Sequence, residues 1–162
     1  MSKLINKFTR RSFLATGSVG AVSTLAMSHG VSAQQATPEE SQNIEIVNSF
    51  CAAFAVPWDW EKITSFLTSD CKYRASQDVP MVEGPDGVVG LWTNWLEGFL
   101  EDASSAEFEV LDTWARGPVV VDDRVDRFVL PDNTLDIRVV GIFYLTDGKI
   151  AEWTDFTFDS QQ

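Results

Sequence analysis

The stretch 119-VVVDDRVDRFVLPDNTLDIRVVGIFYLTDGKIAEWTDFTF-158 decides the fold of this 162-residue chain. β-Branched and aromatic residues dominate it between two short breaks, Pro-Asp-Asn at 131–133 and Thr-Asp-Gly at 146–148. The pattern predicts three long strands, at 119–130, 135–145 and 150–158. Breaks this short between strands this long indicate an antiparallel meander.

The residues before this stretch predict mainly helices. Thr37-Pro38-Glu39-Glu40 is a capping box with proline at the first helical position, so a helix starts there and runs to about Ala55. The other expected elements are a short helix at 58–67, a strand at 71–76, a third helix after the turn at 84–87, and a strand at 107–115. Helices followed by strands predict the α+β class, with helices covering one face of a strongly curved sheet. Residues 34–162 are expected to form one domain.

Residues 1–33 have the pattern of a secretory signal peptide that is cleaved before Gln34. A basic segment, Lys3 to Arg11, precedes a mildly apolar stretch, and Val31-Ser32-Ala33 supplies the small residues expected at a cleavage site. The sequence TRRSFL at 9–14 resembles the twin-arginine export motif. That resemblance implies export of the folded protein by the twin-arginine (Tat) machinery to the periplasm or the extracellular space.

The rest of the chain is strongly acidic. Four of the 12 basic residues lie in the first 33 positions, which hold no acidic residue, so the remaining 24 acidic and 8 basic residues give a formal charge of −16. Such a chain repels phosphate backbones, which argues against nucleic-acid binding. The single histidine, His29, lies in the signal segment. Histidine-assisted nucleophiles and histidine-ligated metals are therefore excluded from the domain.

Cys51 and Cys71 are the only cysteines. Two cysteines are too few for a four-cysteine zinc site or a cysteine-ligated iron–sulfur cluster. In an oxidising compartment they can form a disulfide, and the alternative is two buried thiols in separate elements. The sequence does not give their separation, so both alternatives stay open.

Charged residues alternate along the predicted strand at 119–130. Because successive side chains of a strand point to opposite faces, Asp122, Arg124 and Asp126 share one face. This face is either solvated, as charged strands usually are, or it lies on the concave side of the curved sheet as a polar cluster in an apolar pocket.

Two further polar residues lie among apolar ones. Asp155, in the last predicted strand, shares a face with Trp153 and Thr157, and it is either a hydrogen-bonded structural residue or part of a site. Tyr73, one of two tyrosines, lies in the first predicted strand. It is either a half-buried core aromatic or a site residue.

Two segments of the chain resemble the limonene-1,2-epoxide hydrolase family. They are DRVDRF at 123–128, which holds an Arg-x-Asp pair, and VGIFYLTDGKIAEWTDF at 140–156. The resemblance extends through the strand around Tyr73 and the segment EGPDGVVGLWTNWLEGFL beginning at Glu83, and it covers about 40–158. The hairpin in the second segment is shared more widely, among proteins that resemble nuclear transport factor 2 and the SnoaL cyclases.

The resemblance implies a cystatin-like or nuclear transport factor 2-like cone. In it, a curved, mixed but mostly antiparallel sheet is wrapped by three to four N-terminal helices around a deep apolar cavity, and a homodimer is expected. The family's catalytic set is an Asp–Arg–Asp triad with a Tyr and an Asn that hold water. Carried over to this sequence, the matching residues are Asp155, Asp126, Arg124 and Tyr73. Ala75 stands where the family has the Asn, and strand alternation puts the nearby Ser76 on the face opposite Tyr73.

The implied chemistry is cofactor-independent addition of water to an epoxide to give a vicinal diol. An ionised Asp155 takes a proton from the attacking water, and a protonated Asp126 gives one to the leaving oxygen. A small apolar epoxide, terpene-like or alicyclic, is the expected substrate because aromatic residues are expected to line the pocket. These candidates are Trp92, Trp95, Phe99, Trp114, Phe143 and Trp153. No metal and no cofactor are expected.

Two alternative functions fit the same fold. One is an exported SnoaL-like module that binds an apolar ligand without catalysis, which Ala75 and the export signal favour. The other is a ketosteroid-isomerase-like or cyclase-like enzyme, in which one Asp abstracts a proton beside a carbonyl. An inward-facing Arg74 or Arg138 would favour an anionic or carbonyl-bearing ligand.

Overall fold

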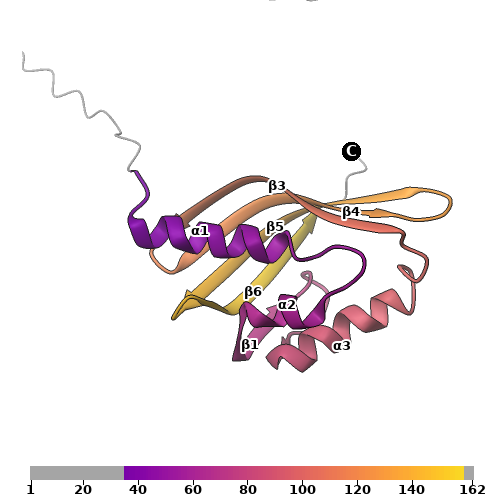
Figure 1. The fold of residues 1–162 in the computed structure, drawn as a ribbon, viewed down its shortest axis with the longest axis horizontal. Coiled ribbons are helices and arrows are strands. Elements are labelled where there is room, and N and C mark those ends of the chain that lie inside the picture. Colours follow the sequence, from indigo (N-terminus) through magenta and orange to yellow (C-terminus); the bar gives the residue numbers. More distant parts are fainter. Residues whose placement is uncertain (1–34, 159–162) are drawn as a thin grey trace, which may run out of the picture. The chain divides into compact units, whose positions relative to one another are not determined.

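The computed structural model describes residues 35–158, and the expected signal peptide lies outside them. Within this range the chain forms three helices and six strands (Figure 1). In chain order they are α1 (Pro38–Cys51), α2 (Trp60–Ser65), β1 (Leu67–Arg74), β2 (Val82–Glu83), α3 (Gly84–Leu96), β3 (Ser105–Arg116), β4 (Val119–Val129), β5 (Thr134–Thr146) and β6 (Lys149–Phe158). No helix in the described range is long and apolar enough to cross a membrane.

The six described strands form one sheet, in the order β2-β1-β6-β5-β4-β3. The strands from β3 to β6 pair antiparallel in sequence order, so the predicted meander is confirmed. β1 runs parallel to β6, which makes the sheet mixed. α1 packs across β3 and β4, and α3 packs against β1 (Figure 1). The predicted α+β fold, a curved and mostly antiparallel sheet with N-terminal helices, is confirmed.

The capping box starts α1 as predicted and also ties this helix to the sheet. Thr37 Oγ1 accepts a hydrogen bond from the Glu40 amide (3.2 Å), and Glu40 Oε2 accepts one from the Thr37 amide (2.8 Å). Glu40 Oε1 accepts another from the Gly117 amide (2.9 Å), and Asn43 Nδ2 donates to the Gly117 carbonyl (3.1 Å). The start of α1 is therefore fixed to the turn that leads into β4, the strand with the charged face.

Several element boundaries differ from the prediction. α1 ends at Cys51, earlier than expected, and Phe54 beyond it folds into the core. β1 begins at Leu67, where it already pairs with β6, and it ends at Arg74 rather than at 76. The two-residue strand β2 is not predicted, because a strand so short has no readable periodicity.

The core lies between the helices and the inner face of the sheet. Phe50 and Phe54 pack edge-on against Trp153 of β6, with ring centroids 4.9 and 6.0 Å apart. Phe54 also stacks on Phe108 of β3 at 4.4 Å. Burial of large aromatic rings supplies much of the hydrophobic stabilisation in such a core. These contacts join the end of α1 to both halves of the sheet.

Both cysteines are buried free thiols, Cys51 in α1 and Cys71 in β1. Of the two alternatives left open by the sequence, the structure therefore has the second, thiols in separate elements. Burial raises the pKa of the Cys51 thiol well above its ordinary value, so this group stays protonated.

Candidate active site

The face of β4 that carries Asp122, Arg124 and Asp126 points into the core. Their relative exposures are 0, 0 and 6 %, and they alternate with residues on the outer face of the sheet. On that outer face, Asp123 forms an ion pair with Arg138 of β5. The charged face of the predicted strand is therefore buried on the concave side, the second of the two alternatives open from the sequence.

The Arg124 guanidinium contacts three carboxylates, one along each edge. Its Nη1 lies 3.0 Å from Asp122 Oδ1, its Nε 2.7 Å from Asp126 Oδ1, and its Nη2 2.9 Å from Asp155 Oδ1. The guanidinium also lies 5.2 Å from the ring centre of Phe108, so apolar surface covers it. Arg124 thereby joins two strands, β4 and β6, into one charged cluster.

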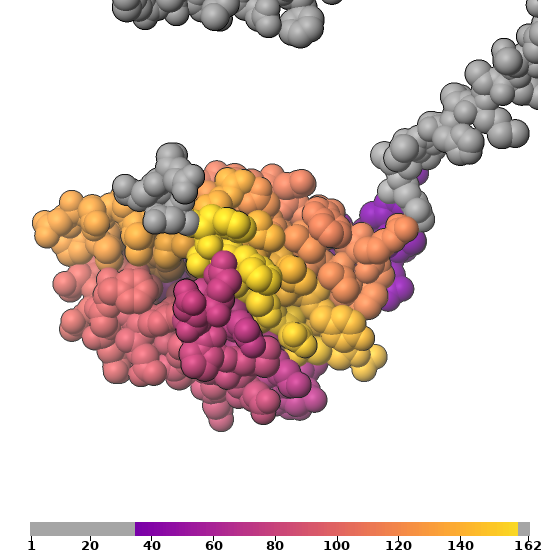
Figure 2. Space-filling model, turned by 180° about the vertical axis from the view of Figure 1, so that it is seen from behind, coloured from indigo at the N-terminus to yellow at the C-terminus, as the bar shows by residue number. Residues whose placement is uncertain are grey.

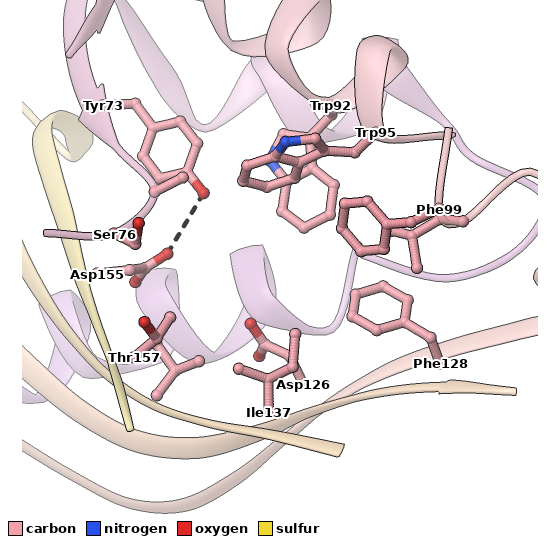
Figure 3. A pocket seen from close by; sticks show the side chains of 13 residues that line it. Tyr73, Ser76, Trp92, Trp95, Phe99, Asp126, Phe128, Ile137, Asp155 and Thr157 are labelled. Carbon is pink, nitrogen blue, oxygen red and sulfur yellow. Dashed lines mark hydrogen bonds between the residues drawn. The ribbon is translucent and has the colours of Figure 1, made fainter. Parts of the chain in front are cut away.

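Asp155 is held by two more donors, both from aromatic residues. Trp153 Nε1 donates to Asp155 Oδ1 at 2.7 Å, and the Tyr73 hydroxyl donates to Asp155 Oδ2 at 3.4 Å (Figure 3). The Tyr73 and Trp153 rings stack with centroids 3.7 Å apart. Burial raises the pKa of Tyr73 well above its ordinary value, so its hydroxyl keeps its proton. The orientation of Asp155 is therefore fixed from two sides.

One cation and three carboxylates cannot all stay charged in this buried cluster at low cost. Burial lowers the pKa of Arg124, but the carboxylates beside it raise it well above its ordinary value, so the guanidinium stays charged. Burial raises the pKa of Asp155 to about 7, against the opposing effect of Arg124. Burial also raises the pKa of Asp126. The Asp126–Asp155 pair therefore gains and loses a proton near neutral pH.

A cavity of about 300 Å³ opens beside this pair. In the space-filling view a hollow lies between the magenta segment that follows β1 and the coral segment at the end of α3 (Figure 2). The cavity is lined by Tyr73, Ala75, Ser76, Trp92, Trp95, Phe99, Leu100, Asp126, Phe128, Ile137, Val139, Asp155 and Thr157. The tryptophans, Phe99 and Phe128 form its apolar side, facing the Tyr73–Asp155 pair (Figure 3). Three predicted substrate-binding residues, Trp92, Trp95 and Phe99, are among them.

The other three predicted substrate-binding residues do not line this cavity. Trp114 is 54 % exposed, because a β-bulge at 110–112 reverses the alternation of β3 and turns this side chain outward. Phe143 and Trp153 do point inward, but they are buried behind the cavity wall, where their rings stack 5.8 Å apart. Trp153 acts on the site as a hydrogen-bond donor to Asp155 rather than as a wall of the pocket.

Ala75, in the position of the family's asparagine, lines the cavity, and so does Ser76. The prediction that Ser76 faces away from Tyr73 is wrong, because β1 ends at Arg74 and strict alternation ends with it. The Ser76 hydroxyl lies on the same side of the cavity as Asp155 (Figure 3).

Several lining residues were not among the predicted site residues. Phe128 could have been found from its parity with Asp126 on β4, and Thr157 from its parity with Asp155 on β6. Ser76 lies past a strand end and carries no periodic signal. Within the described range, no group of histidine, cysteine, aspartate and glutamate residues is arranged to hold a metal ion.

The sequence model of the limonene-1,2-epoxide hydrolase catalytic domain matches residues 41–162. This span contains all four predicted catalytic residues. A comparison with curated proteins gives no match.

Solved structures with this fold carry different descriptions. An M. tuberculosis LEH-like epoxide hydrolase is 22% identical with a TM-score of 0.62, over 75% of this chain and 86% of that chain. A protein described as a SnoaL-like polyketide cyclase from Jannaschia sp. CCS1 is 20% identical with a TM-score of 0.64, over 76% and 90%. TerC, crystallised with polyporic acid, is 18% identical with a TM-score of 0.58, over 72% and 92%.

At these identities the solved structures support the fold alone. The family match is the stronger finding, since it spans most of the chain. On that basis the chain belongs to the limonene-1,2-epoxide hydrolase catalytic domain family.

Proposed function

We propose that this protein hydrolyses small apolar epoxides to vicinal diols without a cofactor. One observation carries the proposal: Arg124 joins two buried carboxyl groups, Asp126 and Asp155, that both border one aromatic-lined cavity. Opening an epoxide needs a base at the attacking water and an acid at the ring oxygen. Two carboxyl groups whose pKa values are raised toward neutrality can divide that work.

Asp155 acts as the base in this reaction. A water held by Asp155 and Tyr73 bonds through its oxygen to one epoxide carbon and loses a proton to Asp155. Asp126 gives its proton to the ring oxygen as the ring's carbon–oxygen bond breaks. The diol leaves, and one proton returns from Asp155 to Asp126 to restore the starting state. The net charge beside Arg124 is the same before and after the reaction, so this buried cation needs no new partner.

The cavity lining supports an uncharged, apolar substrate. The lining residues include no lysine or arginine, so nothing on the wall attracts an anionic ligand. Arg138, which would have favoured an anion if it faced inward, lies on the outer face with Asp123. A volume of about 300 Å³ is at the small end for ligand sites, which fits a terpene-like or alicyclic epoxide.

Ala75 favours the alternative of an exported module that binds an apolar ligand without catalysis. The family's asparagine would help to hold the attacking water, and an alanine side chain makes no hydrogen bond. The hydroxyls of Ser76 and Thr157 border the cavity and can supply the missing contact. The remaining alternative, a ketosteroid-isomerase-like or cyclase-like enzyme, needs only one of the two acids as a base.

The test is diol formation by the purified protein from limonene oxide and cyclohexene oxide. We expect turnover by the wild type and a loss of about 100-fold or more in Asp155→Asn and in Asp126→Asn. Asp123→Asn is the matched control, because this neighbour lies on the outer face of β4, and it should keep full activity. Thermal stabilisation by limonene oxide without turnover would support the binding module instead.

Export by the twin-arginine route and assembly into a homodimer remain proposals. The outer face of the sheet carries large apolar side chains that are 40 to 54 % exposed: Ile142, Tyr144, Phe158 and Trp114. A second copy covering this face would bury them, and light scattering of the purified protein tests for it.

A further inference from the structure

One carboxylate of the Arg124 cluster has no part in the proposed reaction. Asp122 is fully buried and does not line the cavity, so it cannot touch a substrate there. It is nevertheless firmly held. Asp122 Oδ1 accepts hydrogen bonds from the Gly141 amide (2.8 Å) and Arg124 Nη1 (3.0 Å), and Asp122 Oδ2 accepts one from the Cys51 thiol (3.3 Å). Three donors from three different residues therefore fix the position and orientation of this carboxylate.

Gly141 makes room for this arrangement. A Cβ at this position would lie 2.5 Å from Asp122 Oδ1 and 2.5 Å from Arg124 Nη1. Only glycine lets the Asp122–Arg124 ion pair lie directly on the backbone of β5 and receive its amide hydrogen. Three elements, α1, β4 and β5, thus supply contacts to a group that does not line the cavity.

We propose that Asp122 is a positioning residue that fixes Arg124 from behind and offsets its charge, so that Asp126 and Asp155 keep one shared proton. The catalytic meaning of this role rests on the proposed hydrolase function. Arg124 with Asp122 forms a neutral ion pair. The two carboxyls facing the cavity then behave as a buried pair of like charges, which cannot both ionise near neutral pH.

The other charged and titratable groups around the cluster do not take over the role proposed for Asp122. They are Tyr73 from β1, Cys51 from α1, and Arg124, Asp126 and Asp155 themselves. Burial raises the pKa of both the tyrosine and the thiol, so both stay neutral. Among the described groups that contact Arg124, Asp122 is therefore the only one outside the reacting pair with a charge opposite to that of the guanidinium.

The test removes the charge of Asp122 with two neutral side chains, Asp122→Asn and Asp122→Ser. The first readout is a carbon-13 NMR titration of aspartate-labelled protein, with the Asp126 and Asp155 signals assigned from their Asn variants. We expect the titration of the pair to move down by about one pH unit in both variants, because Arg124 then acts on the pair without an opposing charge. The second readout is the pH profile of epoxide turnover, in which the rise caused by ionisation of Asp155 should move in the same direction.

Asp123→Asn is again the matched control, and it should leave both readouts unchanged because it lies on the outer face. Folded Asp122 variants with an unmoved titration would overturn the proposal. Loss of the folded state in both variants would also overturn it, since Asp122 would then be a structural residue only. Absence of epoxide turnover by the wild type would refute the proposed function, while the NMR titration would still decide the role of Asp122.

Discussion

Replacing Asp155 by Asn should change how the stability of the protein depends on pH. The native chain keeps a proton on Asp155 up to about pH 7, whereas the unfolded chain releases it near the ordinary value of 3.8. Over the pH range between these values the native state binds more protons than the unfolded state. The free energy of unfolding contributed by this group therefore falls as pH rises through that range, and it is highest in acid.

The size of the effect follows from the difference between the two pKa values. A shift of one pKa unit corresponds to about 1.36 kcal/mol, and the carboxyl is fully buried, so little of the effect is screened by solvent. Between about pH 4.5 and about pH 8, the loss of this proton should lower the free energy of unfolding of the wild type by about 3 kcal/mol. Asp155→Asn cannot lose a proton. Its stability relative to the wild type should therefore improve by about 3 kcal/mol over the same range.

Urea unfolding of both proteins at several pH values measures this difference directly, provided that the denaturant slope is the same for both. Val139→Ala is a suitable control, because it removes a buried, non-titratable side chain from the wall of the same cavity. Its destabilisation should be the same at every pH. Parallel pH curves for the wild type and Asp155→Asn would refute the reasoning, since Asp155 would then have a similar pKa in the native and unfolded chains.

Three further predictions concern the site. The kcat/KM for epoxide hydrolysis should be low in acid, where Asp155 is protonated and cannot act as the base, and it should rise toward about pH 7 as Asp155 ionises. A flat profile between pH 5 and 8 would contradict the role assigned to Asp155. Gly141→Ala should destabilise the protein by about 1–3 kcal/mol, because the new methyl group would overlap Arg124 in a packed core, and thermal unfolding measures this. Gly90→Ala is its control, since a Cβ there meets no atom within 4 Å, and it should be neutral or stabilising. Phe99→Ala should raise KM for an apolar epoxide several-fold with little change in kcat, because Phe99 borders the cavity away from the two acids. A several-fold loss of kcat in this variant would contradict the prediction.

The sequence predicted the strands of the meander well because their periodicity and their turns agree. It grouped Asp122, Arg124 and Asp126 on one face of a strand, but the choice between solvent and core depends on which side α1 covers. That is a tertiary contact, and alternation within one strand carries no information about it. The family resemblance supplied Asp155 and Tyr73 as partners of Arg124, and the structure brings these groups into contact.

The errors have local physical causes. The prediction that Trp114 lines the pocket is wrong because the bulge in β3 turns this side chain outward, and aromatic composition carries no signal of a bulge. The prediction for Ser76 is wrong because the end of β1 cannot be located to within a residue from the sequence pattern alone. Asp122 was seen on the correct face but not as a site residue, since its importance depends on Gly141 and Cys51, which lie on two other elements.

The bulge in β3 affects how readily this protein aggregates at high concentration. β3 is an edge strand of 12 residues, and a long flat edge is an open template for strand addition by another chain. The bulge interrupts the regular spacing of backbone hydrogen-bonding groups along β3. Three acidic residues also place negative charge along this strand: Glu107, Glu109 and Asp112. At the opposite edge, β2 is only two residues long. Neither edge suits the ordered stacking of strands that begins fibril growth, so this domain should resist that form of aggregation even when its apolar outer face is uncovered.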